Sequence, residues 1–131
     1  MEFSDRTLGK RERLKSRKAI AELFKGGKSA KAYPIRLVYR LIAPVEGEPP
    51  VRMGFVASKR SFRRAPDRNF IKRRMREAYR LGKAPLYDFL AARGVHLEGM
   101  LIFTGRELPD QALLHRSWRK LLRRLDPDSS P

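Results

Sequence analysis

Residues Ser58–Leu81 read SKRSFRRAPDRNFIKRRMREAYRL, and this stretch decides how the rest of the chain is interpreted. It contains ten lysines and arginines but only two acidic residues, Asp67 and Glu77. The surface of an ordinary small domain mixes the two signs more evenly. The stretch is therefore expected to face a polyanion, because a cluster of one sign repels itself when it is left in water.

The spacing within this stretch predicts a helix over Asp67–Leu81, and Pro66 suits its first turn because the missing N–H is not needed there. At about 100° per residue, the apolar side chains gather on one side of the helix: Ile71, Met75, Ala78 and Tyr79. The opposite side spans about 100° of arc and holds Asn69, Lys72, Arg73, Arg76 and Arg80. Such a helix can dock on a core and present its cations to nucleic-acid phosphates.

The composition of the whole chain points in the same direction. Its 131 residues fit one domain, and 31 basic against 14 acidic residues give a net charge of +17. Nucleic acid is the first candidate partner, and an anionic membrane surface is the second. The chain has no cysteine, which excludes disulfides, a cysteine zinc site and a thiol nucleophile. It has no run of about 18 apolar residues, and its N-terminus does not resemble a signal peptide.

Hydrophobic periodicity predicts the remaining elements. We expect helices at Arg17–Lys25, Leu86–Arg93 and Pro109–Leu125, and strands at Lys28–Lys31, Ile35–Ile42, Val51–Ser58 and Leu97–Thr104. The main elements follow the order α-β-β-β-α-β-α, with Leu86–Arg93 as an extra turn or two. This order predicts a single compact α+β domain with a small mixed sheet. We expect a flexible basic arm at 1–15, an RNA-binding domain at 16–125 and a disordered tail at 126–131.

Candidate catalytic groups are few. The two histidines, His96 and His115, fall on different predicted elements, and no cluster with metal-ligand spacing is found. A binding module is therefore favoured over an enzyme that uses its own side chains. Aromatic residues near cations, among them Phe24 and Tyr39, suit single-stranded RNA, whose bases can stack on them. The alternative interpretation is that Phe24 and Tyr39 belong to the core.

Two sets of residues resemble a known family. Ser58-Lys59-Arg60, Arg68-Asn69 and the run Lys72–Arg80 are similar to the signature of the bacterial ribonuclease P protein subunit. Arg13-Leu14-Lys15, Leu23-Phe24-Lys25 and Gly27-Lys28 resemble the region around that family's first helix. The resemblance covers roughly Leu14–Leu125. It implies the fold of the second domain of ribosomal protein S5, with a left-handed β-α-β crossover through the basic helix.

The resemblance also implies a function and a set of residues. The family's enzyme is an endoribonuclease that removes the 5′ leader from precursor tRNA, with the chemistry on its RNA subunit and no catalytic residue on the protein. The positions implied to face RNA are Lys59, Arg60, Arg68, Asn69, Lys72, Arg73 and Arg76, and Arg80 joins them on helical spacing. The leader cleft is implied to include Ile20, Phe24 and Tyr39. Phe70 departs from the family pattern, which has a cation there, and Ile20 stands where an aromatic residue is common.

The same resemblance implies Mg²⁺ as cofactor, bound mainly by the RNA subunit and the substrate. The expected partners are the ribonuclease P RNA and precursor tRNA, in the cytoplasm, with neither a membrane nor an obligate protein partner. The main alternative is a structural RNA-binding protein of ribosomal type without a role in cleavage. A DNA-binding regulator and a membrane-surface protein are more distant alternatives.

Overall fold

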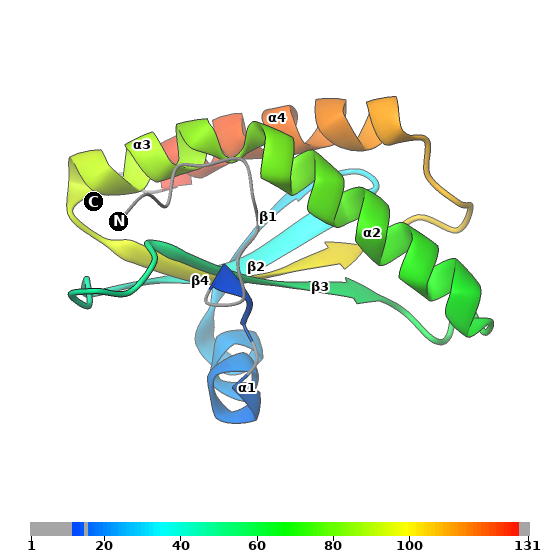
Figure 1. The fold of residues 1–131 in the computed structure, drawn as a ribbon, viewed down its shortest axis with the longest axis horizontal. Helices are drawn as coiled ribbons and strands as arrows, with labels where there is room; N and C mark the ends of the chain where they lie inside the picture. Colours follow the sequence, from blue (N-terminus) through cyan, green and yellow to red (C-terminus); the bar gives the residue numbers. More distant parts are fainter. Residues whose placement is uncertain (1–11, 15, 129–131) are drawn as a thin grey trace.

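The computed structural model describes residues 12–14 and 16–128, with side chains described up to residue 125. Four helices and four strands follow one another along the chain (Figure 1). Their bounds are α1 Arg17–Gly26, β1 Lys28–Ala32, β2 Ile35–Ile42, β3 Val51–Ala57, α2 Ala65–Gly82, α3 Ala84–Arg93, β4 His96–Phe103 and α4 Gln111–Asp128. None of the described helices is long and apolar enough to cross a bilayer.

The strands form one mixed sheet in the order β1-β2-β4-β3. The β1–β2 and β2–β4 pairs are antiparallel, whereas β3 and β4 are parallel neighbours. A parallel pair needs a long connection, and α2 followed by α3 supplies it. The predicted α+β class with a small mixed sheet is confirmed.

The connection holds one helix more than the predicted order. Lys83 closes α2 and also caps the N-terminus of α3, and Pro85 follows within the first turn of α3. Because proline fits the first turn of a helix but not its interior, the chain restarts a helix here instead of extending α2.

Helices cover both faces of the sheet, but unequally (Figure 1). On one face α2, α3 and α4 enclose the main core, which includes Leu37, Met75 and Trp118. On the other face α1 covers a second cluster formed by Leu14, Leu23, Val38 and Met100. Successive residues of a strand point to opposite faces, so Leu37 and Val38 enter different clusters.

The predicted arm at residues 1–15 is wrong at its C-terminal end. Glu12 and Leu14 are buried, and Arg13 forms a parallel β-bridge with Met53 at the edge of β3. The rest of that predicted arm, apart from Glu12–Leu14, lies outside the described residues. The predicted tail at 126–131 is also wrong in part, because α4 continues to Asp128, while 129–131 lie outside the described residues.

A buried ion pair fixes Glu12 to the helices. Lys83 Nζ lies 2.8 Å from Glu12 Oε2, and the Tyr87 hydroxyl donates to the same oxygen. Both charged side chains are almost fully buried. Burying charges is tolerable only when they are paired and hydrogen-bonded, so these contacts hold the segment before α1 in one place.

Candidate nucleic-acid interface

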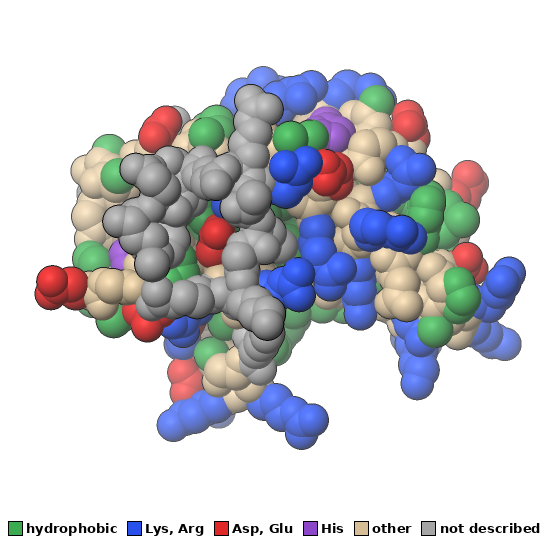
Figure 2. Space-filling view, viewed as in Figure 1, with side chains coloured by type: hydrophobic (Ala, Val, Ile, Leu, Met, Phe, Trp, Pro, Cys, Tyr) green, Lys and Arg blue, Asp and Glu red, His purple; other side chains and the backbone are tan. Residues whose placement is uncertain are grey.

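The helix α2 has the two faces that its sequence predicts. Ile71, Met75, Ala78 and Tyr79 are its buried side chains. The cations of the opposite side are exposed or half-buried, and we call them the α2 stripe: Lys72, Arg73, Arg76 and Arg80. Basic side chains gather on this side of the molecule beneath α2 (Figure 2).

A second element brings a cation to the α2 stripe. Burial lowers the pKa of Arg76, and the nearby charge of Arg13 lowers it further. The guanidinium of Arg76 also lies over the ring of Phe55, 5.7 Å from its centroid. A bound phosphate would reduce the repulsion between two like charges held this close together. Arg13 was not among the predicted site residues, and its place depends on the buried Glu12, which no periodic pattern indicates.

The C-terminal end of the α2 stripe is partly neutralised. Arg80 donates from Nε to Glu77 Oε2 at 3.2 Å and forms an ion pair with the same carboxylate. The hydrogen bonds from Arg80 lower the pKa of Glu77, and the carboxylate in turn raises the pKa of Arg80. Arg80 therefore offers less uncompensated charge to RNA than Arg73, which is exposed.

The loop before α2 is shaped by one of the predicted RNA-facing residues. Arg68 Nη1 donates to the backbone oxygens of Phe62 and Arg63, each at 2.8 Å. This use of Arg68 fixes the loop that ends at α2, whereas Lys59, Arg60 and Asn69 are exposed nearby.

Phe70 and Arg74 form a contact of their own on α2. The guanidinium of Arg74 lies 4.4 Å from the centroid of the Phe70 ring, and Phe70 packs against the main core. At the position where the family pattern has a cation, this chain thus places a ring that holds a neighbouring arginine.

The α1 side of the sheet brings two of the three predicted cleft residues together. Phe24 is 51% exposed, and Ile20 is half-buried against the second cluster. Arg36 is exposed on β2, on the face that also carries Val38. Arg40 is held instead by Glu98 and Glu22, at 2.7 Å and 3.0 Å.

The prediction that Tyr39 lines the same cleft is wrong. Tyr39 is 2% exposed and belongs to the main core, on the face covered by α2, α3 and α4. Its neighbours in β2, Val38 and Arg40, point to the α1 side. The alternation within β2 therefore separates Tyr39 from Ile20 and Phe24.

The helix α4 carries a further set of cations that sequence reasoning did not single out. Helical spacing predicts a core stripe on this helix, and Leu114, Trp118 and Leu121 are indeed buried, whereas the predicted Leu113 is only half-buried. Between Leu114 and Leu125 the exposed side chains are all basic, namely Arg116, Arg119, Lys120, Arg123 and Arg124. Helical spacing alone places these cations on the face opposite the core stripe.

The described residues do not gather a metal-binding group of three His, Asp or Glu side chains.

Comparison with known proteins places this arrangement in a family. The family model described as Ribonuclease P matches residues 8–126. The chain belongs to the ribonuclease P protein family. A ribonuclease P protein component from Porphyromonas gingivalis is 41% identical over 118 residues, covering 90% of this chain and 85% of its own length. A counterpart from Chlorobium phaeobacteroides is 33% identical and covers 88% and 86%, respectively.

Solved structures of the Staphylococcus aureus RNase P protein share the fold. One has a TM-score of 0.66 at 18% identity and covers 87% of this chain and 94% of its own. A mutant of that protein with defective mRNA degradation activity has a TM-score of 0.68 at 19% identity, with coverages of 89% and 90%. Family membership assigns the chain to tRNA processing, as the RNA-binding component of a ribonucleoprotein nuclease.

Proposed function

We propose that the chain binds the RNA subunit of ribonuclease P through the α2 stripe and the loop before it. It also holds the single-stranded 5′ leader of precursor tRNA on the α1 side of the sheet. Together these contacts promote Mg²⁺-dependent endonucleolytic removal of the leader. The observation that carries the proposal is the sorting of α2 into a buried apolar face and a cationic face.

The α2 stripe supplies affinity through phosphate contacts. Each cation that neutralises a phosphate releases counterions, so binding is expected to weaken steeply with salt. Arg73 is the exposed centre of the stripe, and Arg13 and Arg76 add a paired cation site beside Phe55. These contacts reduce the repulsion between two RNA molecules that must approach each other.

The α1 side offers a different kind of contact. Phe24 presents an exposed ring above a face that also carries the exposed Arg36. Unpaired bases stack on such rings, while nearby cations follow the backbone. This combination suits a single-stranded leader better than a duplex.

Magnesium is assigned to the RNA and the substrate in this proposal. The gathered acidic side chains that would hold such an ion are absent from the described part of the protein. The protein's own residues bind and orient the two RNAs, and the setting is the cytoplasm, where precursor tRNA is processed.

The first test is multiple-turnover cleavage of a 5′-extended precursor tRNA with a cognate ribonuclease P RNA at low magnesium, with and without the protein. We expect correct 5′ processing only when both components are present. Tight RNA binding without any support of cleavage would contradict the proposal and favour a ribosomal-type role.

Phe24→Ala tests the leader contact. Stacking of one base on an aromatic ring is worth about 1–3 kcal/mol, so affinity for a leader-bearing substrate should fall about five-fold or more. Binding of leaderless tRNA should be unchanged, because the ring is half exposed and contributes little to the core. Equal losses for both ligands would contradict a leader-specific role.

A further inference from the structure

The outer face of α4 is cationic along its middle. Arg116, Arg119, Lys120, Arg123 and Arg124 are all exposed, and we call this set the α4 stripe. They occupy about 140° of arc at about 100° per residue and extend over about 12 Å of helix. The buried face opposite includes Leu114, Trp118 and Leu121, so the stripe cannot turn inward.

The positive charge of the α4 stripe is little neutralised by acidic side chains of the protein. Among the ion pairs recorded between described residues, none involves α4. Arg124 donates to the backbone oxygen of Lys31, which positions it without neutralising it. Like charges three and four residues apart on a helix are destabilising, so the stripe is most favourable against a polyanion.

The α4 stripe is separate from the α2 stripe. Glu77 of α2 and His115 of α4 are close enough to interact electrostatically. In Figure 2 a row of basic side chains runs along the top of the molecule over α4. Acidic and histidine side chains separate it from the basic side chains beneath α2. One straight nucleic-acid strand on the α2 stripe would not cover α4.

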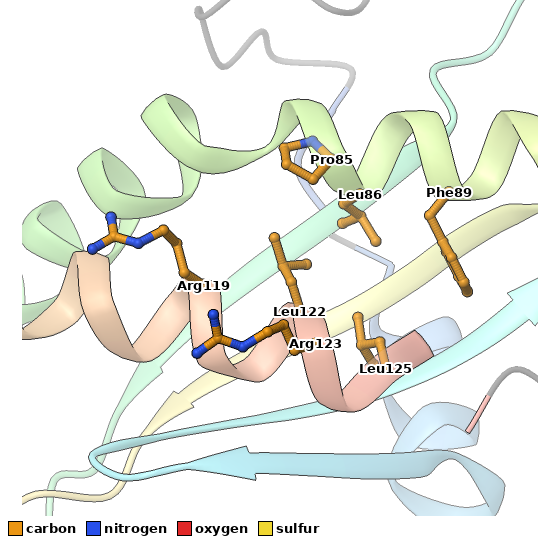
Figure 3. A pocket seen from close by; sticks show the side chains of 7 residues that line it. All are labelled: Pro85, Leu86, Phe89, Arg119, Leu122, Arg123 and Leu125. Carbon is orange, nitrogen blue, oxygen red and sulfur yellow. The ribbon is translucent and has the colours of Figure 1, made fainter. Parts of the chain in front are cut away.

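A groove between α3 and α4 borders the α4 stripe and indicates what kind of RNA it would bind. Figure 3 shows Leu86 and Phe89 of α3 facing Leu122 and Leu125 of α4, with Arg119 extending along one side. The Phe89 ring is already covered by Arg93, whose guanidinium lies 4.5 Å from its centroid. This groove thus offers cations without an open aromatic ring, unlike Phe24 on α1. The exposed Tyr33 lies instead at the β1–β2 turn, where its backbone oxygen accepts from Ser117 Oγ of α4.

We propose that the α4 stripe is a second RNA-binding surface, which contacts the phosphate backbone of a double-helical RNA segment. Paired RNA is recognised mainly by its shape and backbone, because its bases are not available for stacking. The inference rests on the proposed function in that the ligand is RNA. It adds that the protein contacts RNA on two sides, so that it can bridge two RNA segments.

The test neutralises the α4 stripe with Arg116→Gln, Arg119→Gln, Lys120→Gln and Arg123→Gln together, and keeps Arg124 because of its backbone contact. The probe is a short RNA hairpin duplex, titrated at several salt concentrations. If the four cations contact phosphates, the log–log salt slope should fall by about 3–4. Affinity at about 0.1 M salt should fall at least ten-fold.

A matched control removes the same charge elsewhere. Lys18→Gln, Lys25→Gln, Lys28→Gln and Arg106→Gln together neutralise four exposed cations outside both stripes. This control should change the slope by less than about 1. Equal slopes for the two variants would overturn the inference, as would equal competition by polyglutamate and duplex RNA. If neither the wild type nor the Arg73→Gln variant binds the RNA hairpin in this titration, the proposed function fails instead.

Location is tested with a tethered cleavage reagent. The chain has no cysteine, so Ala112→Cys on α4 and Ala65→Cys on α2 each create a unique site for an iron chelate. Both positions are exposed. With the ribonuclease P RNA we expect cleavage at two different groups of nucleotides, and those near residue 112 should be paired. An absence of cleavage from residue 112, or the same nucleotides from both probes, would overturn the inference.

Discussion

On one face of the sheet, three helices bury a continuous cluster that includes Trp118, Tyr79 and Met75, whereas on the other face the ten-residue α1 covers four buried side chains. Hydrophobic stabilisation grows with the apolar area removed from water, so the first side carries most of the stability. The α1 side keeps Phe24 half exposed. The molecule thus separates the part that holds the fold from a part that is left available for a ligand.

Trp118→Ala should have the largest effect on stability. Its indole is 1% exposed, lies 5.3 Å from the Tyr79 ring between centroids, and donates to the Gly82 backbone oxygen at 2.8 Å. Truncation leaves a cavity and an unpaired carbonyl, so the free energy of unfolding should fall by about 3–5 kcal/mol. Denaturant titration measures this loss.

Leu23→Ala on the α1 side sharpens the same comparison. Leu23 is fully buried, but its cluster is small and its helix can move inward, so we expect a loss near the lower limit of about 2 kcal/mol. If Trp118→Ala and Leu23→Ala lower the free energy of unfolding equally, both faces of the sheet contribute alike to stability.

Glu12→Gln tests the segment that connects the two sides. Its carboxylate pairs with Lys83 on the helical side, while Leu14 enters the cluster on the α1 side. Removing one partner leaves a buried ammonium without its counter-charge, which costs about 3 kcal/mol in the free energy of unfolding.

The matched control for this prediction is Glu22→Gln, measured in the same denaturant titration. Glu22 is also a partner of an ion pair, with Arg40, but its side chain is 47% exposed. Its loss should cost at most about 1 kcal/mol. A Glu12→Gln variant as stable as Glu22→Gln would contradict the inference that the buried pair holds the segment.

Glu77→Gln should have the smallest effect. The Glu77 and Arg80 side chains are 40% and 34% exposed, so solvent screens the pair to about 0.5 kcal/mol or less. The pKa of Glu77 is lowered, chiefly by the hydrogen bonds from Arg80, so its contribution is present above the unfolded value of about 4.3. It is lost as pH falls through the folded pKa. Unfolding measured from neutral to acid pH should show the wild type and the variant converge.

The sequence predicts α2 and the strands β2 and β3 to within about two residues, because these elements have clear periods of 3.6 and 2. It also predicts that Ile35, Leu37 and Tyr39 share one face of β2, which the main core confirms. It does not predict which face lies beneath α1. Helices cover both faces of this sheet. The alternation of side chains along a strand therefore separates two sets of residues, but it does not show which set packs against which helix.

The burial of Glu12 is not predicted, and Leu86–Arg93 is predicted only as an extra turn or two rather than as the separate helix α3. A glutamate in a charged N-terminal segment is expected to be exposed. The burial of Glu12 depends on Lys83, which lies 71 positions away in the sequence. The end of α2 and the start of α3 share Lys83, so Gly82 and Pro85 mark the junction between two helices without an intervening loop. The predicted RNA-facing set lies mostly on or near α2, where helical spacing indicates it directly, whereas Arg13 is brought near Arg76 by its β-bridge with Met53.

The β-bridge between Arg13 and Met53 has a consequence for self-association. A strand at the edge of a sheet exposes backbone groups that can pair with another chain. At the β3 edge the Leu14 amide already donates to the Met53 backbone oxygen at 3.2 Å. The opposite edge, β1, has five residues and carries the exposed Lys28 and Lys31, and short, lysine-bearing edges resist pairing. Because both edges are protected in this way, copies of the chain are not expected to join sheet to sheet, even at high concentration.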